Sequence, residues 1–271
     1  MISELRKMGV FIARDFRILF SYKLAFSMSF MGIVFTLFYL VLFGSMFESV
    51  EISALLPYGG DFIQYVLVGS IGWGFLTSIM GSTAGALRSE MQIGTLESIL
   101  LTPTKIFTMI ISYSLFGSFF GLLTMAVLLI VGYFFFGIAA FAGASIFTLI
   151  IFILSMMTMT GFGLLFAGLT IWLKNIGTTV AIFQNISMFF CGVYFPLSVL
   201  PEVVRPIHYV IPFYYSIEGL RVSLIPGSNF SDLWPYIGPL IGFSILFIIV
   251  GLFVLNYGLK KAKKDGSLMF Y

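Results

Sequence analysis

The chain has 271 residues, of which 60% are hydrophobic, 18% are aromatic and only 9% are charged, with a formal net charge of +3. Soluble domains carry about 25% charged residues, so this composition excludes a water-covered surface, and the high hydrophobicity excludes disorder. The single cysteine, Cys191, excludes a disulfide scaffold, and the chain lacks the basic, aromatic-rich clusters that bind nucleic acid. The composition therefore predicts an integral all-α membrane protein.

Apolar stretches of about 20 residues mark helices that cross a bilayer. Six such spans are predicted, namely Leu24 to Met46, Phe62 to Ala86, Ile106 to Gly132, Ser145 to Ile171, Gly177 to Phe195 and Pro235 to Tyr257. The uncharged run 106–173 is too long for one span, and its Gly- and Ala-rich segment 137–144 predicts a turn. The fifth span is interrupted by two adjacent amides, Gln184 and Asn185.

Residues 1–23 precede the first span and predict an amphipathic helix in the membrane interface. Its apolar side chains share one helical face and are Ile2, Leu5, Met8, Ile12, Phe16, Leu19 and Phe20. Basic side chains, including Arg14 and Arg17, occupy another face. At the other end of the chain, the basic tail 258–271 predicts a stop at the membrane surface, with recognition of an acidic lipid as the alternative.

The loop 87–105 between the second and third spans is too long for a simple turn. Glu90, Gly94 and Glu97 recur at helical spacing, and Leu96, Ile99 and Leu100 form an apolar patch. We expect a short surface helix that offers carboxylates and apolar side chains to a cytoplasmic partner. The alternative is a solvated loop that only joins two spans.

The segment 196–234 before the last span contains five prolines, so it is too broken for a span, yet it is too apolar for a free loop. Short helices that dip into the outer leaflet fit this pattern. Two i,i+3 pairs, Glu202 with Arg205 and Glu218 with Arg221, are expected to neutralise their charges.

The distribution of lysine and arginine sets the orientation, because cytoplasmic segments carry the excess of basic residues. With six spans both chain ends share one side, and 12 of the 14 basic residues then fall there. Only Arg205 and Arg221 fall on the opposite side. Both ends are therefore expected in the cytoplasm, within a single transmembrane domain over residues 1–271.

The chain carries no recognisable energy-converting or catalytic group. It has no Gly-Lys dipeptide, which excludes a P-loop, and its lone histidine, His208, and lone cysteine cannot form a metal cluster. The six spans contain no ionisable side chain, which argues against a proton- or sodium-driven carrier. This pattern is typical of one subunit of a machine that a separate protein powers.

Three features together resemble the permease subunits of ABC-2 type exporters. The first is the six-span layout with an amphipathic N-terminal helix that carries Arg14-Asp15. The second is the loop Glu90-x-x-x-Gly94-Thr95-Leu96-Glu97 followed by Leu100-Leu101-Thr102-Pro103, which looks like the family's E-x-x-x-G-T-x-E-x-L-x-x-T-P region. The third is the proline-broken external segment, with Phe195-Pro196, Leu200-Pro201, Pro212-x-x-Tyr215 and Arg221 before the last span, although Ile211 stands where many members have Asn.

The resemblance implies two permeases, in this case a homodimer, driven by two cytoplasmic ATPase subunits that hold ATP and Mg²⁺. This chain would bind no cofactor. The residues 87–105 would contain the coupling helix that docks on the ATPase, with contacts from Glu90, Gly94, Thr95, Leu96, Glu97 and Leu100. The second and fifth spans would face the dimer axis and place Gln184, Asn185, Phe189 and Phe190 near the substrate path. For the two amides, hydrogen bonding to neighbouring helices is the alternative.

The substrate class is less constrained than the architecture. Phe-rich, uncharged spans favour a lipophilic cargo, and export of a lipid-linked polysaccharide is the alternative within the same family. Outside transport, the alternative functions are a membrane enzyme and a non-transporting assembly subunit. Separate permease and ATPase chains are typical of the cytoplasmic membrane of a prokaryote, where membrane lipid surrounds the protein.

Overall fold

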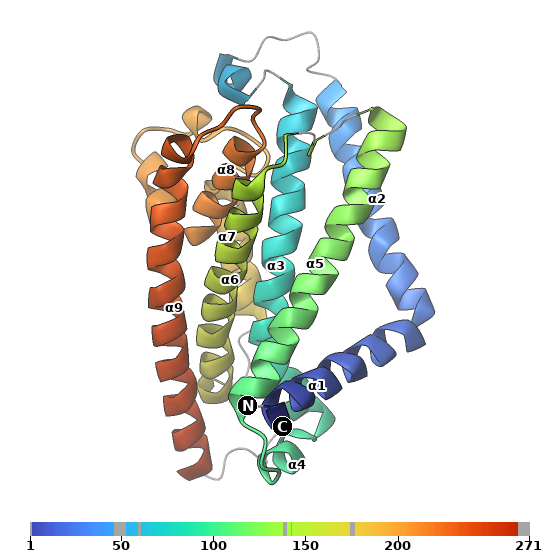
Figure 1. Ribbon diagram of the computed structural model, residues 1–271, viewed down its shortest axis with the longest axis vertical. Helices are drawn as coiled ribbons and strands as arrows, with labels where there is room; N and C mark the ends of the chain where they lie inside the picture. Colours follow the sequence, from blue (N-terminus) through green and yellow to red (C-terminus); the bar gives the residue numbers. More distant parts are fainter. Residues whose placement is uncertain are drawn as a thin grey trace.

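The computed structural model describes residues 2–45, 53–58, 61–137, 140–141, 143–173 and 177–264, and it contains only helices and their connections there. Figure 1 shows a bundle of long helices that run between two ends. The α-helices are α1 (Ile2–Ser21), α2 (Lys23–Ser45), α3 (Phe62–Ile93), α4 (Leu96–Leu100), α5 (Ile106–Phe136), α6 (Ile146–Leu173), α7 (Gly177–Phe190), α8 (Pro212–Ser223) and α9 (Phe230–Lys264). Three short 3₁₀ helices are η1 (Ser53–Tyr58), η2 (Leu197–Val199) and η3 (Arg205–Val210).

Four helices, α3, α5, α6 and α9, are long and apolar enough to cross a membrane, and the bent pair of α1 and α2 gives up to five candidates. The chain is therefore a multi-pass helical membrane protein, while the count of six spans stays a prediction. The helix α7 has 14 residues and is about 21 Å long, shorter than a hydrocarbon core of about 30 Å. It ends at Phe190, so the expected continuation of the fifth helix to Phe195 is wrong.

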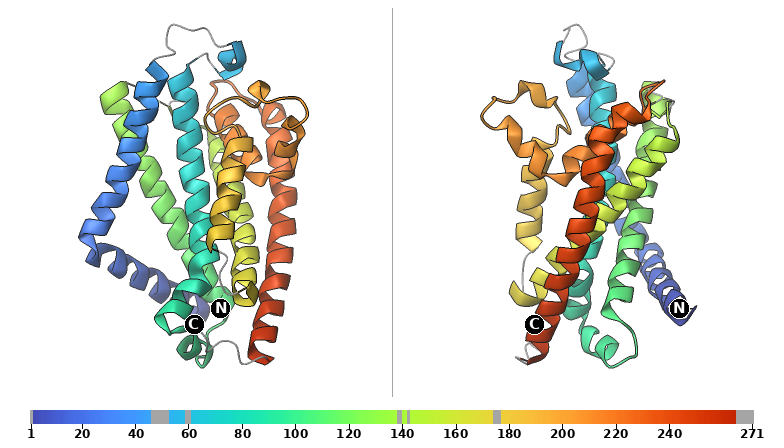
Figure 2. Two further views of the ribbon diagram at one scale, coloured as in Figure 1. Left: turned by 180° about the vertical axis from the view of Figure 1, so that it is seen from behind. Right: turned by 60° about the vertical axis from the view of Figure 1, so that its left-hand side comes forward.

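The two ends of the bundle differ in what they hold. In Figure 1, α1, α4 and the last turns of α9 lie together at the lower end, which we term the inner end. The upper end holds η1 and α8 and is termed the outer end. Figure 2 shows that the chain between α7 and α9 folds over the outer end of α7. The expected short helices in the segment 196–234 are present as η2, η3 and α8.

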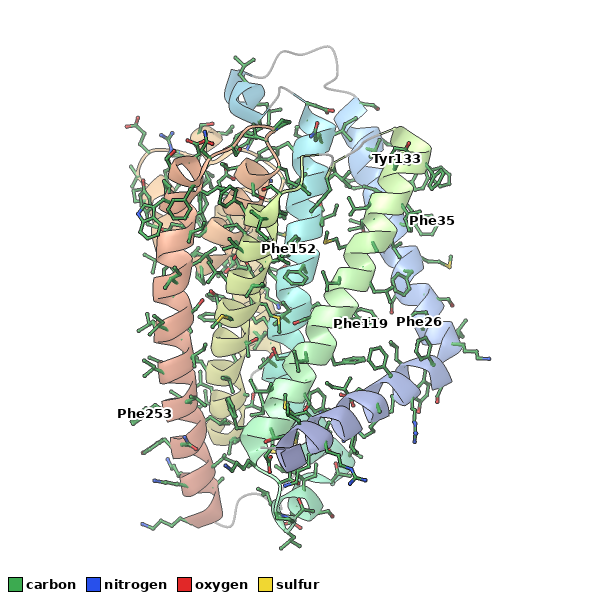
Figure 3. All side chains as sticks on the ribbon, in the orientation of Figure 1. Phe26, Phe35, Phe119, Tyr133, Phe152 and Phe253 are labelled. Carbon is green, nitrogen blue, oxygen red and sulfur yellow. The ribbon has the colours of Figure 1, made fainter. Side chains whose placement is uncertain are left out.

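The helix predicted for residues 1–23 is present as α1, and the chain bends by 84° between 4–21 and 23–39, while its place in the membrane interface stays a prediction. Its apolar face packs on α5, because the Phe16 ring lies 5.3 Å from Phe116 and 4.7 Å from Phe119. Phe20 also contacts Phe26 of α2, with ring centroids 5.8 Å apart. Figure 3 labels Phe26 and Phe119 near the corner where these three helices meet.

The second predicted span is longer than expected. The helix α3 continues seven residues past Ala86 to Ile93, and it ends because Gly94 adopts a left-handed conformation with φ of 77°. The added turns are held by burial, since Leu87 and Met91 pack with Leu96 and Met109 in one apolar cluster. Much of the expected coupling loop is therefore the inner end of α3.

The most extensive helix packing joins α6 and α9, which run in the same direction. A Cβ atom at Gly251 would lie 2.6 Å from the carbonyl oxygen of Gly161, and one at Gly258 would lie 2.8 Å from that of Gly168. Two glycines spaced by seven residues on each helix thus form a seam that brings the backbones together. Among the G-x-x-x-G pairs in the sequence, Gly117 and Gly121 pack closely on α3, whereas other members such as Gly242 face open space.

The glycine seam predicts opposite effects for two alanine substitutions. Gly168→Ala places a Cβ 2.6 Å from the backbone nitrogen of Leu255, so we expect it to destabilise the bundle by about 1–3 kcal/mol. Gly242→Ala meets no atom within 4 Å and should stabilise its helix by about 0.5–1 kcal/mol. Thermal unfolding in detergent measures both, and equal melting temperatures would contradict the seam.

Candidate functional site

The inner end is organised around one buried carboxylate, Glu90, which lies in the last turn of α3 and is 1% exposed. Arg14 of α1 forms an ion pair with it at 2.7 Å, and the Tyr113 hydroxyl of α5 donates to the same oxygen at 2.7 Å. The Thr95 hydroxyl donates to its other oxygen in a short hydrogen bond. A single carboxylate thus joins α1, α3, α5 and the residue that precedes α4.

The local chain path explains why Thr95 reaches Glu90. Gly94 takes the left-handed conformation that turns the chain back on the helix, and the Thr95 amide then donates to the Glu90 carbonyl at 3.0 Å. In this helix-ending motif the residue after glycine returns to the last turn. The sequence pattern E-x-x-x-G-T therefore describes a helix end whose threonine caps the glutamate side chain.

Arg14 is held from several sides. It donates to Asp15 at 2.9 Å and to the Tyr113 hydroxyl at 2.7 Å, and its guanidinium carbon lies 5.5 Å from the centre of the Tyr113 ring. Arg14 is therefore directed into the bundle instead of joining a solvated basic face. One oxygen of Asp15 is buried without a hydrogen-bond partner among the described residues. The side chains around Arg14 therefore include a hydrogen-bond acceptor that no donor satisfies.

A second set of bonds ties the start of α1 to the start of α5. Lys7 donates to Glu4 at 2.8 Å and to the carbonyl of Pro103 at 2.7 Å, while the Thr108 hydroxyl donates to the other oxygen of Glu4 at 2.6 Å. The helix α1 is thus attached at two places to the start of α5 and the residues just before it, through Glu4 and Lys7 and through Arg14.

The α4 segment presents a different surface from the one expected. Leu96 is 2% exposed, and Ile99 and Leu100 pack against the inner apolar cluster, so the predicted apolar patch faces the bundle. The expectation that Glu90 offers its carboxylate to the cytoplasm is wrong, because its partners lie within the chain. The exposed side chains at this tip include Ile93 at 67%, Leu101 at 89% and Glu97.

The four residues expected near the substrate path lie on α7 but do not share one face. Asn185 and Phe189 are exposed, Gln184 is partly exposed, and Phe190 packs on the core cluster that contains Phe213. Neither amide side chain has a hydrogen-bond partner among the described residues. The exposed stripe of α7 also includes Ile182 and Ile186, at 54% and 50% exposure.

At the outer end the predicted ion pairs have different outcomes. Glu218 and Arg221 form theirs at 3.0 Å, as expected. The expected pair of Glu202 with Arg205 is wrong, because Arg205 donates instead to the carbonyls of Ser198 and Leu200. In the part of the chain that the structure describes, no group of three His, Cys, Asp or Glu side chains could hold a metal ion.

A family model described as ABC-2 type transporter matches residues 9–225, from α1 to the residues after α8. The chain belongs to the ABC-2 type transporter family. Individually curated proteins provide no match to it. As a member of this family, the chain is a membrane subunit of an ABC transporter, and the ATPase of such a transporter resides in a partner.

The resemblance drawn from the sequence is thereby confirmed for the family. The role of residues 90–101 in coupling and of the α7 residues in the substrate path stay predictions. Sequence reasoning missed Tyr113, since a tyrosine within an uncharged apolar run carries no local signal for a buried hydrogen bond. It did single out Arg14-Asp15, but as part of a family pattern and not as the partner of Glu90.

The contacts of Glu90 predict that two substitutions that each remove a negative charge at the inner end of the permease differ in their effect on stability. Glu90→Gln leaves the half-buried Arg14 without its main counter-charge, so we expect a loss of about 1.5–3 kcal/mol in stability. Glu97→Gln changes an exposed side chain and should alter stability by less than about 0.5 kcal/mol. Thermal unfolding of both variants in detergent checks the difference.

A double-mutant cycle tests whether the two charges act as a pair. Because each single change leaves the other charge buried, Arg14→Gln combined with Glu90→Gln should cost less than the sum of the two single changes. Strict additivity would show that the ion pair contributes no stability.

Proposed function

We propose that the chain is the permease of an ABC exporter in the cytoplasmic membrane of a prokaryote, and that its α4 tip receives the motion of a separate ATPase subunit. The observation that carries this proposal is the set of contacts around Glu90, which we term the Glu90 cluster. Thr95, the residue before α4, donates to the Glu90 carboxylate, and the same carboxylate binds α1 and α5. ATP and Mg²⁺ would bind in the partner, where hydrolysis takes place.

The cluster supplies a mechanical path from the tip to the spans. A displacement of α4 pulls on Thr95 and hence on Glu90, because Gly94 keeps the turn close to the last turn of α3. Glu90 cannot move alone, since separation from Arg14 would leave two charges unpaired in a poorly hydrated site. The tip, α1 and the inner ends of α3 and α5 are therefore expected to move as one unit.

The docking surface for the ATPase would be the exposed part of this tip. Ile93 and Leu101 supply apolar anchors, and Glu97 supplies a carboxylate beside them. This set replaces the predicted contacts of Glu90, Leu96 and Leu100, which face inward. The basic excess at the inner end supports a cytoplasmic position for that end under the positive-inside rule, where an ATPase is available.

A homodimer is proposed because α7 leaves an apolar stripe with unpaired amides on the outside of the subunit. An amide in hydrocarbon costs free energy unless another polar group satisfies it, and a second copy brings an equivalent Asn185 and Gln184 to the same level. The substrate path would then run along α7 between the two subunits. The proposal counts α2 and α7 with the four long helices as six crossings.

The cargo is proposed to be lipophilic or lipid-linked. The spans lack charged residues and are rich in phenylalanine, which suits an apolar cargo, although aromatic side chains also suit the sugars of a lipid-linked polysaccharide. A non-transporting assembly subunit is the alternative outside transport. Substrate-dependent stimulation of the partner's ATPase activity distinguishes the two, because an assembly subunit would show none.

Co-purification from native membranes in mild detergent tests the partner and the docking surface. We expect a stoichiometric P-loop ATPase, identified by mass spectrometry, and at least a tenfold loss of it when Glu97→Lys and Leu101→Asp remove the complementary charge and the exposed anchor. The matched control is Glu202→Lys with Val203→Asp, which makes the same changes on exposed residues at the outer end. Recovery of the chain alone, where a known ABC complex survives, would refute the permease assignment.

The proposed path along α7 predicts altered selectivity when its amides are removed. Gln184→Ala with Asn185→Ala should change the relative export of test compounds, because hydrogen bonds to a passing substrate are lost. Asn256→Ala removes an exposed amide from α9 and should leave selectivity unchanged. Unaltered export of every compound by the α7 variant would place the path elsewhere.

A further inference from the structure

A second buried ion pair lies at the outer end, and the function proposed above makes no use of it. Arg221 and Glu218 of α8 are each 5% exposed and are joined at 3.0 Å between Nη1 and Oε2. Glu218 also accepts a short hydrogen bond from the Tyr58 hydroxyl of η1. The pair therefore attaches α8 to the segment that precedes α3.

The guanidinium of Arg221 reaches two further parts of the chain. Its Nη2 donates to the carbonyl of Tyr65 on α3 at 3.2 Å and to the carbonyl of Val193, just past the end of α7, at 3.0 Å. The guanidinium carbon lies 3.6 Å from the centre of the Tyr65 ring. One side chain thus holds α8, α3 and the outer end of α7 together, and we term this set of contacts the Arg221 clamp.

Two glycines make the clamp sterically possible. A Cβ atom at Gly69 would collide with the Val193 carbonyl and with Nη2 of Arg221, so only glycine allows this approach of α7 to α3. Gly192 has a φ of 67° and directs its carbonyl to the Tyr65 hydroxyl, which donates to it at 2.8 Å. The end of α7 is therefore fitted against α3 through backbone groups.

The clamp also forms one wall of a cavity at the outer end. This cavity has a volume of about 210 Å³, and its lining includes Tyr58, Gln64, Tyr65 and Arg221. Behind the clamp lies the packed interior, where Cys191 is fully buried two residues before Val193. The clamp thus lies between an open cavity and the closed core beside α7.

We propose that the Arg221 clamp is a releasable latch that keeps the outer end of α7 closed against α3. This proposal rests on the proposed function, in which the substrate path runs along α7. On the outer side α7 forms one wall of that path, so a separation of α7 from α3 changes the width of the exit there. The contacts between them that the clamp supplies are the bonds of Nη2 to the carbonyls of Tyr65 and Val193.

The composition of the clamp suits repeated opening. Separation of a buried ion pair is costly, because each charge is left uncompensated in a low dielectric. Here both charges belong to α8 and are three residues apart, so they can move together as a neutral pair. The hydrogen bonds to carbonyls and to the Tyr58 hydroxyl and the contact with the Tyr65 ring must break, but the Arg221 charge keeps its partner throughout.

The test uses Cys191, the chain's only cysteine, as a reporter of the closed state. A membrane-impermeant maleimide is added to the outside of cells that contain the complete transporter, and the labelling rate is measured against a denatured sample. Tyr58→Phe and Arg221→Lys should each raise the rate about tenfold, because each removes bonds that hold the latch. The matched control is Arg205→Lys, which changes another arginine of the outer segment that binds carbonyls.

The latch is overturned if both variants label at the rate of the unmodified chain, or if Arg205→Lys raises the rate equally, since that indicates general loosening. Should Arg221→Lys fail to accumulate, Tyr58→Phe carries the test, because it removes a single hydroxyl. Co-purification of the ATPase is scored in the same cells. Unchanged labelling with the ATPase retained rejects the latch alone, whereas loss of the ATPase from the unmodified chain rejects the proposed function.

Discussion

Burial of charge in a bundle that has almost none is the constraint on which both ends of this structure depend. A buried carboxylate is tolerated only where an opposite charge and hydrogen-bond donors surround it. Glu90 meets this requirement with partners from three other segments, and Glu218 meets it with partners from its own helix and from η1. Each carboxylate consequently decides which helices are held together at its end of the molecule.

The two ion pairs differ in a way that matters for motion. The inner pair joins different helices, so the elements it connects are forced to move together. The outer pair lies within α8, so it can leave its neighbours without being broken. Between these ends, the glycine seam brings the backbones of α6 and α9 together, whereas α7 exposes much of one face. The fold thus combines one closely packed helix pair with one ion pair that ties helices together and another that can leave its neighbours intact.

Local patterns in the sequence were sufficient for much of the architecture. Apolar length located α3, α5, α6 and α9, amphipathic spacing located α1, and an i,i+3 spacing located the pair of Glu218 and Arg221. Sequence reasoning failed where the deciding contact is distant. Glu90 looked exposed because charged residues in loops usually are, and its partners Arg14 and Tyr113 lie in other helices. The end of α3 was misplaced because packing of Leu87 and Met91, and not apolar length, extends the helix to Gly94.

The parallel direction of α6 and α9 has a consequence for how the protein is made. Two helices that run the same way cannot be joined by a tight hairpin, and here α7, α8 and the outer segment lie between them in the chain. During synthesis the grooves at Gly161 and Gly168 therefore remain empty in the bilayer until the last helix has been inserted. Pairing of α6 with α9 is thus a late event, and a nascent chain that stops before α9 presents an unfilled helix face to the membrane's quality-control proteases.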